Sequence, residues 1–401
     1  MTSGTIVAEI TDYANRADPY PLYAELRKQP VRRLDDGTFV VSTYYEVRSL
    51  ANDPRMSNDT NNRLAGYARV GQPVESGLPS SFIFTDPPVH DRLRDTINRP
   101  FGPPHSPRFL DGLRGDLAKV VDELLDAFEG KDQVDIVEDF AYPLPVTAIC
   151  KVLGVPRGDE PRFHVWADAL ASSLDPSAGD EGSQEKAQRA RQDLGAYLGD
   201  LIETKRRHPG PGMLSALAPT MAPSDLEATA VLLLVAGHET TVNAITNTTL
   251  TLLRHPEILQ RFQKEPDLAV PIIEEVLRYE PPVQFVPWVT ALDDVEVAGT
   301  LIPKGSPIWL MVAAANRDPR RFEDPDRFDP DRKDNEHLGF YTGIHYCFGA
   351  PLARMELHLA VPELFRRVKL SRLIEDPPPY RANAVLRGPR HLPVAIEGLT
   401  A

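Results

Sequence analysis

The stretch Phe340-Tyr341-Thr342-Gly343-Ile344-His345-Tyr346-Cys347-Phe348-Gly349 says more about the fold of this chain than any other. A lone cysteine is usually a small buried hydrophobe, but Cys347 has one glycine four residues before it and another two residues after it. Glycines let the backbone press against a flat ligand. A helix expected to open near Pro351 would offer amide donors and a positive dipole end, which favour a thiolate. The pattern predicts a thiolate that acts either as a metal ligand or as a nucleophile.

The chain has one other cysteine, Cys150, and it lies far from Cys347 in the sequence. No nearby second cysteine therefore suggests a zinc knuckle. A nucleophile of the protease type would need a separate histidine partner, and no local signature points to one. Two cysteines are also too few for a disulfide framework and are consistent with a reducing compartment.

A long helix is expected in the middle of the chain. Ser224 followed by Glu227 forms a capping box, and the helical pattern runs from there to about Arg254, where His255-Pro256 stops it. Residues 231–235 are apolar on every side of such a helix. This pattern indicates a helix that runs through a core.

Polar residues follow that apolar stretch directly, in the order Ala236-Gly237-His238-Glu239-Thr240-Thr241. One interpretation is local: each threonine bonds back to the carbonyl four residues earlier, and Glu239 lies at a surface edge. The other interpretation is a proton relay at a break in the helix, where Gly237 lets a ligand or water approach the backbone. The spacing alone does not decide between them.

The composition limits the class of protein. Of the 401 residues, 42% are hydrophobic and 25% are charged, which is typical of a globular chain. The net charge of −14 argues against binding along a nucleic-acid backbone. The longest apolar run, residues 228–237, is about half as long as a membrane span. Residues 1–25 show no signal peptide. We expect a cytoplasmic protein that binds neither nucleic acid nor a membrane.

The periodicity of the remaining sequence indicates a mainly α-helical protein with small β-sheets. Residues 110–207 have apolar residues at spacings of three and four almost throughout. Strand signals occur at residues 295–303, 308–313 and 393–396. The polar stretch 57–81 predicts a long loop, and long loops in compact proteins tend to be functional.

Taken together, these residues resemble a soluble bacterial cytochrome P-450, a heme-thiolate monooxygenase, over nearly the whole chain. Residues 340–349 fit the family's F-x-x-G-x-x-x-C-x-G heme loop in full, and Glu239-Thr240 falls on the acid–threonine pair of its central helix. Residues 275–278 fit the E-x-x-R motif, and residues 325–328 fit the segment that supplies a second arginine. Residues 86–94 fit the D-P-P-x-H-x-R-x-R stretch.

The resemblance implies a cytochrome P-450 fold in which residues 1–401 form a single domain around one heme b. Cys347 would be the axial iron ligand, a thiolate that pushes electron density toward bound oxygen. His90 and Arg94 are four residues apart, so they share one helix face, and with His345 they would meet the heme propionates. The implied cofactor-binding set is Cys347, His90, Arg94, His345, Phe340, Gly343 and Gly349.

The resemblance also implies catalytic and structural roles. Glu239 and Thr240 would be catalytic, as the pair that controls proton delivery. Glu275, Arg278 and Arg327 would form a buried ion triad behind the heme loop and would be structural. Such a triad stabilises a protein only when it is buried, because a pair on the surface contributes little.

Two positions depart from the family pattern. Many members place an arginine after the E-x-x-R helix, where it contacts a propionate, yet Val289 or Trp288 occupies that place here. One propionate would therefore be held differently. Tyr341 stands where a small residue is more common, which would alter packing beside the heme.

The implied reaction is oxygen activation and insertion of one oxygen atom into a mid-sized, mostly apolar substrate, for which a natural product is the expected class. Neither the substrate nor the choice among hydroxylation, epoxidation and oxidative coupling follows from the sequence. A peroxide-driven peroxygenase would more naturally lack Glu239-Thr240, and a heme sensor or carrier would keep the fold without turnover. The substrate-binding residues implied by the resemblance are Leu78, Ile83, Leu232, Val235, Ala236, Phe285, Val286, Val385 and Leu386.

The expected electron donors are a separate ferredoxin and its ferredoxin reductase. The heme-enzyme pattern uses essentially the whole chain, and two cysteines cannot hold a cluster that needs about four. Residues 351–372 and 92–114 each carry five basic and two acidic side chains, a local balance of 5 − 2 = +3, and Arg366 and Arg367 belong to the first stretch. The resemblance places both on the thiolate side of the heme, where an acidic ferredoxin would dock. The chain is expected to be a monomer.

Overall fold

The computed structural model describes residues 3–66, 81–101, 107–171 and 181–400. The helices are α1 (Ser3–Thr11), α2 (Tyr20–Arg27), α3 (Tyr44–Ala51), α4 (Val89–Phe101), α5 (Pro107–Asp126), α6 (Pro143–Leu153), α7 (Glu160–Ala171), α8 (Glu181–Arg207), α9 (Met213–Leu217), α10 (Pro223–Arg254), α11 (Pro256–Lys264), α12 (Ala269–Tyr279), α13 (Val312–Ala315) and α14 (Ala350–Arg367). The strands are β1 (Val31–Arg33), β2 (Phe39–Val41), β3 (Met56–Ser57), β4 (Gln133–Asp135), β5 (Val286–Ala291), β6 (Val295–Val297), β7 (Thr300–Ile302), β8 (Pro307–Leu310), β9 (Val368–Leu373) and β10 (Pro393–Leu399).

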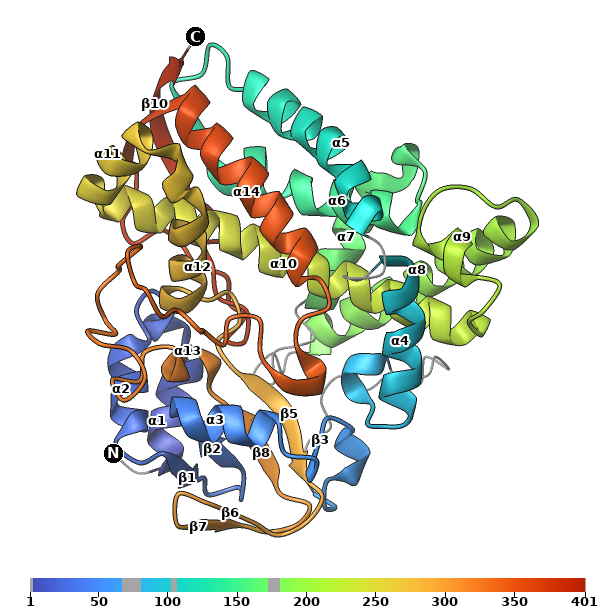
Figure 1. Ribbon diagram of the computed structural model, residues 1–401, viewed down its shortest axis with the longest axis vertical. Coiled ribbons are helices and arrows are strands. Elements are labelled where there is room, and N and C mark those ends of the chain that lie inside the picture. The colour runs from blue at the N-terminus through green and yellow to red at the C-terminus, as the bar shows by residue number, and fades with distance from the viewer. Residues whose placement is uncertain (1–2, 67–80, 102–106, 172–180, 401) are drawn as a thin grey trace.

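Helices and sheets occupy different parts of the molecule. In Figure 1, α1 to α3 lie with the largest sheet in the lower part, and α5, α6, α10, α12 and α14 lie above them. That sheet has the strand order β1-β2-β8-β5-β3, with β2 and β8 parallel and the other neighbours antiparallel. Two smaller antiparallel sheets have the orders β4-β10-β9 and β6-β7. The prediction of a mainly α-helical fold with small sheets is confirmed.

The long helix α10 joins two hydrophobic clusters. Leu226 and Leu234 pack in a cluster with side chains of α6 to α9. Ile245 and Leu252 pack in another cluster with side chains of α5, α12 and α14. Residues 231–235 lie in the first of these clusters, and most of them also line an internal cavity, which explains why they are apolar on every side. The expected helix through the core is present and ends at Arg254, as the sequence predicts.

The expected capping box at the start of α10 is wrong. The helix begins at Pro223 after Ala222, and no side chain caps it. Ser224 therefore lies inside the first turn instead of before it. Proline at the first helical position explains the shift, because it lacks an N–H that would have no partner there and its φ is already helical.

No break occurs in α10 at Gly237, because the helix is continuous from Pro223 to Arg254. A Cβ at position 237 would lie 2.6 Å from the Cδ1 atom of Ile149 in α6. Gly237 therefore lets α6 pack closely against α10. The helix break that one of the two interpretations required is therefore absent, and the close approach that glycine allows is made by a neighbouring helix.

Helix α10 is also the one described helix that is long and apolar enough to cross a membrane by length and composition. Of its most apolar window, 61% is buried inside the fold, as in the core helix of a protein that does not span a membrane.

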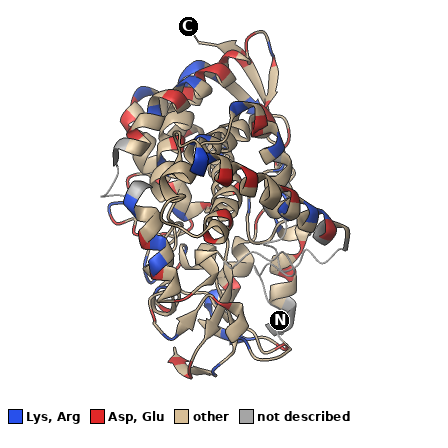
Figure 2. Ribbon diagram, turned by 90° about the vertical axis from the view of Figure 1, so that its right-hand side faces the viewer, with Lys and Arg blue, Asp and Glu red and all other residues tan. Residues whose placement is uncertain are grey.

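The described charged residues lie on many segments, and Figure 2 shows acidic and basic positions interspersed along the helices that face the viewer.

Candidate functional site

A cavity of about 350 Å³ lies beside the middle of α10, a size typical of small-molecule sites. Its walls come from α5 to α8, α10, α14, strand β5 and the segments around residues 81–84, 338–349 and 385–386. Most of the side chains that line it are apolar. The chemistry of the site therefore depends on the few polar groups that reach this space.

Cys347 lies in a tightly folded loop before α14 and lines the cavity. Its backbone N–H donates to the carbonyl of Phe340 at 2.9 Å. Gly343 has a φ of +71°, and a Cβ there would lie 2.4 Å from the carbonyl oxygen of Ala51, so only glycine fits. Phe340 and Gly349 also line the cavity. The loop thus presents the thiol to an enclosed space.

The surroundings of the Cys347 thiol act on it in opposite directions. Burial, the largest influence, raises its pKa, whereas the backbone amides of Gly349 and Ala350 and the charges of Arg94 and Arg354 lower it. The two amides belong to the first turn of α14, whose Pro351 confirms the predicted helix start. Amides at a helix start stabilise a thiolate, so these groups suit a sulfur whose charge is shared with a metal.

His90 and His345 come from distant segments and lie against each other, with ring centroids 4.7 Å apart. The Nδ1 atom of His90 is 2.8 Å from a carboxylate oxygen of Asp91. Nε2 of His90 and Nδ1 of His345 are buried and have no hydrogen-bond partner among the described residues. Burial, followed by the nearby His90 and Arg94, lowers the pKa of His345 to about 3. Two ring nitrogens are therefore left for a ligand.

Arg94 ties α4 to the loop before Cys347. Its two terminal nitrogens donate to the carbonyls of Ile344 at 2.9 Å and Tyr346 at 2.5 Å. Arg94 also lines the cavity. The structure thus brings His90 and Arg94 together with His345, which lies some 250 residues later in the sequence.

Trp288 and Val289, the two alternatives at the missing arginine, point in different directions. Trp288 lines the cavity, and Val289 belongs to a buried cluster beside the large sheet. The Trp288 ring packs edge-on against Phe84, with centroids 5.5 Å apart. Its Nε1 is buried and has no partner in the described part of the chain. Trp288 therefore brings a buried, neutral N–H donor to the wall of the cavity, in place of the expected arginine.

Tyr341 adopts a φ of +59°, in the left-handed region. This conformation costs a residue with a Cβ about 1–2 kcal/mol, which explains why a small residue is more common at this position. The side chain lines the cavity, and burial raises the pKa of its hydroxyl.

These features fit a flat macrocycle with a metal at its centre and carboxylates at its edge. Cys347 would ligate the metal, and the donors of Trp288, His90 and His345 would meet the carboxylates, since buried polar groups are normally paired. In the described residues no cluster of three or more His, Cys, Asp or Glu side chains could hold a metal ion by itself. A metal at this site would therefore depend on one thiolate and the macrocycle.

Glu239 and Thr240 take different directions from α10. The Thr240 hydroxyl donates to the carbonyl of Ala236 at 2.6 Å and lines the cavity. This bond agrees with the local interpretation of the threonine. The surface edge that the local interpretation gave to Glu239 is not observed, because its side chain is only 6% exposed and its carboxylate lies 3.9 Å from Nε of Arg381. A hydroxyl thus faces the cavity with a buried carboxylate beside it in sequence.

Glu356 is a residue that the sequence reasoning missed. It lies on α14 and is buried at the cavity, and burial raises its pKa well above the usual value. One carboxylate oxygen has no partner among the described residues. A carboxylate between Met355 and Leu357, both buried, was the available signal.

Glu275 and Arg278 form a buried pair with two hydrogen bonds, of 2.8 and 2.7 Å. Arg327 is not the third member, which corrects the expected triad. Its side chain is exposed, and its carbonyl accepts a 3.1 Å hydrogen bond from Arg278. The second arginine is Arg332, whose Nε lies 3.4 Å from Glu275. The motif located the right segment, but the chain turns and brings a residue five positions later to the carboxylate.

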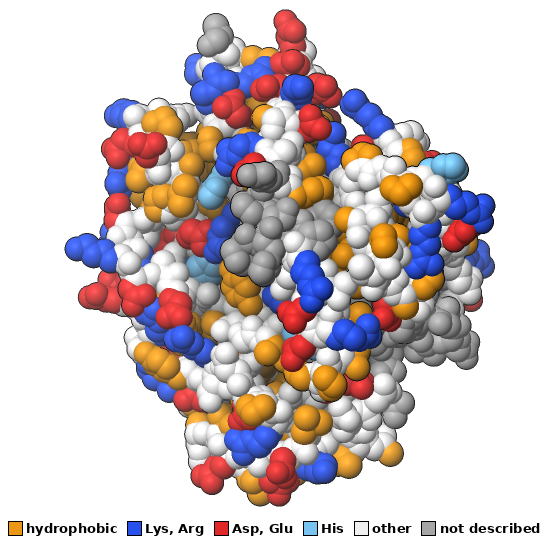
Figure 3. All heavy atoms as spheres, turned by 45° about the vertical axis from the view of Figure 1, so that its right-hand side comes forward, with side chains coloured by type: hydrophobic (Ala, Val, Ile, Leu, Met, Phe, Trp, Pro, Cys, Tyr) orange, Lys and Arg blue, Asp and Glu red, His pale blue; other side chains and the backbone are white. Residues whose placement is uncertain are grey.

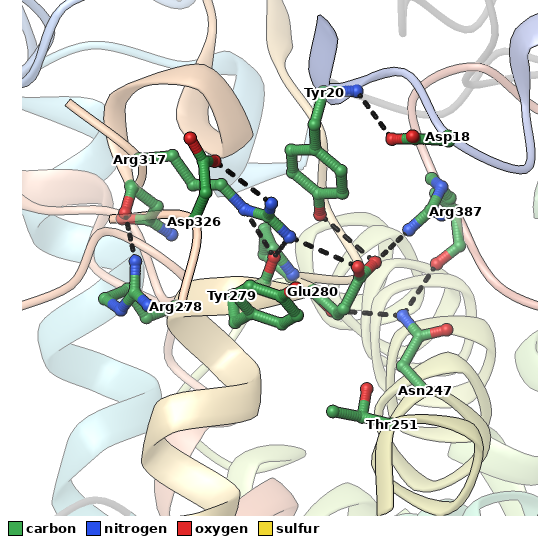
Figure 4. Close-up of polar contacts among 12 residues, drawn as sticks. Asp18, Tyr20, Asn247, Thr251, Arg278, Tyr279, Glu280, Arg317, Asp326 and Arg387 are labelled. Atoms are coloured by element: carbon green, nitrogen blue, oxygen red, sulfur yellow. Dashed lines mark hydrogen bonds and ion pairs between the residues drawn. The ribbon is translucent and has the colours of Figure 1, made fainter. Parts of the chain in front are cut away.

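A second buried ion network surrounds Glu280, at the end of α12 (Figure 4). The carboxylate is paired with Arg387, lies 3.3 Å from Arg317 and accepts a 3.1 Å hydrogen bond from the Tyr20 hydroxyl. Burial acts to raise the pKa of Glu280, but the charges of Arg387 and Arg317 more than offset it. The Arg317 guanidinium also lies 3.3 Å from the centre of the Tyr20 ring. The network joins the N-terminal region to the C-terminal region.

The expected substrate contacts are largely at the cavity. Phe285 is an exception and a correction: it is fully buried and stacks on Trp309, with ring centroids 4.9 Å apart, away from the lining. Strand residues alternate in direction, so Val286 faces the cavity and Phe285 does not. Leu78 lies outside the described residues. The residues that line the cavity as expected are Ile83, Leu232, Val235, Ala236, Val286, Val385 and Leu386.

The basic stretches 351–372 and 92–114 are less basic in the structure than their sequence suggests. Arg366 pairs with Glu363, and Arg367 lies 3.2 Å from Asp122 of α5. Arg354 donates to Glu274 at 2.6 Å. Asp122 and Glu274, which lie outside both stretches, thus neutralise part of the expected local charge; Glu363 is already counted in it. Acidic and basic side chains are interspersed over the face of the molecule drawn in Figure 3.

Comparison with known proteins agrees with this geometry. The sequence model of the cytochrome P450 family matches residues 184–394. Cytochrome P450 monooxygenase PikC of Streptomyces venezuelae is 37% identical, over 94% of this chain and 91% of that protein. Cytochrome P450 107B1 of Saccharopolyspora erythraea is 35% identical, over 98% and 99%. The crystal structure of CYP164A2 from Mycobacterium smegmatis is 36% identical with a TM-score of 0.87, covering 98% of this chain and 100% of that one.

The fold and a single cavity-facing cysteine with unpaired donors nearby define a heme-thiolate protein. The chain belongs to the cytochrome P450 family. It is therefore an oxidoreductase of the monooxygenase type and binds heme b.

Proposed function

We propose that this cytochrome P450 inserts one oxygen atom into a mid-sized, mostly apolar organic substrate, with electrons from a ferredoxin-type donor. The observation that carries the proposal is the shared cavity of Cys347 and Thr240, which is enclosed by apolar side chains. The Cys347 thiol, which can ligate heme iron, and the Thr240 hydroxyl, which can donate and accept hydrogen bonds, therefore line the same mostly apolar cavity.

Cys347 is proposed as the iron ligand, in a loop whose shape Gly343 permits. Heme bound at this thiolate supplies dioxygen activation. The amides of Gly349 and Ala350 hold negative charge at the sulfur. Phe340 fixes the loop by accepting the Cys347 N–H.

His90, His345 and Arg94 are proposed to hold the propionates, and Trp288 replaces the missing arginine. The unpaired nitrogens of the two histidines and of Trp288 support this assignment. Arg94 adds positive charge while its two carbonyl contacts keep it in place. An indole N–H donates one hydrogen bond and no charge, so this propionate would be held by a weaker contact than an arginine makes.

Glu239 and Thr240 are proposed to control proton delivery into the cavity. The Thr240 hydroxyl donates to Ala236, which leaves its oxygen free to accept from a water molecule or ligand. Glu239 is buried, so a proton taken up by its carboxylate would be shielded from solvent. This pair is also what makes a peroxygenase or a non-catalytic heme carrier a poorer explanation of the chain.

Relatives support a natural product or a lipid as the substrate. Their names include 6-deoxyerythronolide B hydroxylase, vitamin D(3) 25-hydroxylase and a polyketide biosynthesis cytochrome P450. Solved relatives were crystallised with myristic acid and with a hexadecenoic acid carried by an acyl carrier protein. A role in secondary metabolism is consistent with these names.

The electron donor is proposed to be a ferredoxin supplied by a ferredoxin reductase, docking behind Cys347. Arg114 of α5 is exposed and makes no hydrogen bond or ion pair with another described residue. Its charge and that of Arg354 both act on His358 of α14, whose pKa is lowered mainly by burial. Arg114 is the proposed centre of the docking face, in place of Arg366 and Arg367, which are paired with carboxylates.

We further propose a cytoplasmic, monomeric enzyme whose residues 1–401 form one domain. The reducing environment that suits free Cys150 and Cys347 supports the location. The acidic net charge of −14 supports the absence of a nucleic-acid partner.

The test is to compare the wild-type holoprotein with Cys347→Ala. The reduced wild-type protein is expected to give the carbon monoxide spectrum of a thiolate-ligated heme and to form product from an apolar substrate under a ferredoxin and reductase. The variant is expected to lose both signals, because no other described residue can supply a thiolate at this loop. Cys150→Ala is the matched control and should retain both. An unchanged spectrum in Cys347→Ala would refute the ligand assignment.

A further inference from the structure

Arg191 interrupts the apolar face of α8. The helix turns so that Ala187, Leu194 and Leu198 are all buried. Arg191 lies four residues after Ala187 and three before Leu194, which places it on the same face. A charged side chain in a buried helical stripe is unusual and needs a reason.

The Arg191 side chain reaches the cavity and has no partner in the described part of the chain. It lines the space together with Phe109, Leu110, Val152 and Leu170, all of them apolar. Burial lowers its pKa, and no carboxylate of the described residues acts on it.

Other arginines of the same helix are satisfied. Arg189 lies 3.9 Å from Glu185, and Arg207 lies 2.7 Å from Glu203, both on the exposed face. The sequence of α8 therefore provides carboxylates to arginines that face solvent and none to the arginine that faces the cavity. Arg191 is partly buried, and a guanidinium that is partly withdrawn from water without an anion is unfavourable. Because the described residues provide no anion, a bound ligand is its natural source.

We propose that Arg191 binds the carboxylate of an amphipathic substrate, whose apolar body fills the cavity toward Cys347. A guanidinium and a carboxylate form a bidentate pair of matching charge. A phosphate would need further donors, and the neighbouring lining residues are apolar. The inference rests on the proposed function and narrows its substrate class to apolar carboxylic acids.

The test uses purified holoprotein and the change in the heme absorption band when a ligand displaces water from the iron. Dodecanoate and dodecan-1-ol have the same apolar chain and differ in charge. Wild type is expected to bind dodecanoate at least about tenfold more tightly than the alcohol. Arg191→Leu should remove that preference and bind the alcohol as wild type does, and Arg191→Lys should restore part of it. Arg189→Leu, two residues away on the exposed face, should behave as wild type.

Two results would overturn the inference. One is a wild-type protein that binds the acid no more tightly than the alcohol; the other is an Arg191→Leu protein that keeps the preference. Either would mean that Arg191 only extends its charged end toward solvent, with its stem packed on the cavity wall. The carbon monoxide spectrum and the response to dodecan-1-ol, recorded on the same samples, report the heme-thiolate site itself. If both are normal while the acid preference is absent, the proposed function stands and the substrate class fails.

Discussion

Two regions of this cytochrome P450 bury polar and charged side chains, and they differ in where the partners come from. Around Glu280, Arg317, Arg387 and Tyr20 pair with one carboxylate inside the protein (Figure 4). Along the cavity, the indole N–H of Trp288 lacks a partner among the described residues. An unpaired buried group costs about 1–3 kcal/mol. The protein pairs its buried charges around Glu280. It can tolerate the cost of the unpaired Trp288 N–H because a bound ligand would supply the partner.

The Glu280 network is structural by this criterion, because its members are paired and lie outside the lining of the cavity. The cavity groups divide by the ligand that they would meet. His90, His345 and Trp288 suit the edge of the heme, and Arg191 suits the substrate. The comparison predicts that changes to internal pairs damage the fold, and that changes to unpaired groups damage binding alone.

The largest effect is expected from Glu275→Gln, which breaks an internal pair. The substitution leaves the Arg278 charge buried without its anion, at a cost of about 3–5 kcal/mol. We expect little holoprotein and a lower free energy of unfolding, measured by chemical denaturation and heme content.

Arg332 and Arg327 sharpen this test. Arg332→Ala removes a side chain that is 10% exposed and 3.4 Å from Glu275, so it should be clearly destabilising. Arg327→Ala should have little effect, because only the backbone carbonyl of that residue takes part. Normal stability of Glu275→Gln, or a larger effect at Arg327 than at Arg332, would contradict the assignment.

Thr240→Ala should affect turnover and leave the fold intact. Its hydroxyl is the part of α10 that faces both an internal carbonyl and the cavity. Without it, we expect reducing equivalents to be diverted to peroxide and the ratio of product to cofactor oxidised to fall about tenfold or more. Glu239→Gln should mainly slow turnover, since it keeps the shape and removes the titrating group.

Thr248→Ala is the control for Thr240. The Thr248 hydroxyl makes the same bond, to the carbonyl of Ala244 at 2.7 Å, but it is buried outside the lining. Peroxide and product are measured together for the wild-type protein, Thr240→Ala and Thr248→Ala. Equal coupling in Thr240→Ala and Thr248→Ala would exclude a role for the cavity-facing hydroxyl.

Trp288→Phe removes one N–H donor and keeps the ring against Phe84. If Trp288 holds a propionate, the rate of heme transfer to apomyoglobin should rise about tenfold or more, in line with the loss of one hydrogen bond to a charged group, worth about 1.5–3 kcal/mol. The unfolding midpoint of the heme-free protein should not fall. Trp309→Phe is the control, because that ring stacks on Phe285 away from the lining. The same heme transfer rate in both variants would leave the second propionate to another residue.

The fold and the cysteine site were predictable because they depend on local patterns. Gly343 adopts a positive φ, which is a local requirement for glycine. An apolar stretch such as residues 231–235 is expected in a core for the equally local reason of its composition. The position of Arg332 was not predictable, since it depends on how the chain after Pro325 turns back on Glu275. The position of Arg191 at the cavity was not predictable either, because it depends on which elements pack against α8. The pairing of Arg367 with Asp122 was not predictable for the same reason, because it joins α14 to α5 and sequence periodicity does not show which helices are neighbours.

The smallest effect is expected at Arg114, an exposed charge with no partner among the described residues. Here the anion would come from a protein partner, whereas at the cavity it would come from a small ligand. Arg114→Glu should slow heme reduction by a ferredoxin about threefold at low salt, because a rim charge mainly alters the rate of encounter. The difference should vanish as salt rises, since the Debye length falls from about 10 Å at 0.1 M to about 3 Å at 1 M. Arg366→Glu changes the net charge by the same amount, but Arg366 is already paired with Glu363, so it should slow reduction less. Stopped-flow reduction rates across a salt series separate the two. Equal slopes for both variants would mean that net charge alone steers the donor and that α5 does not form the docking face.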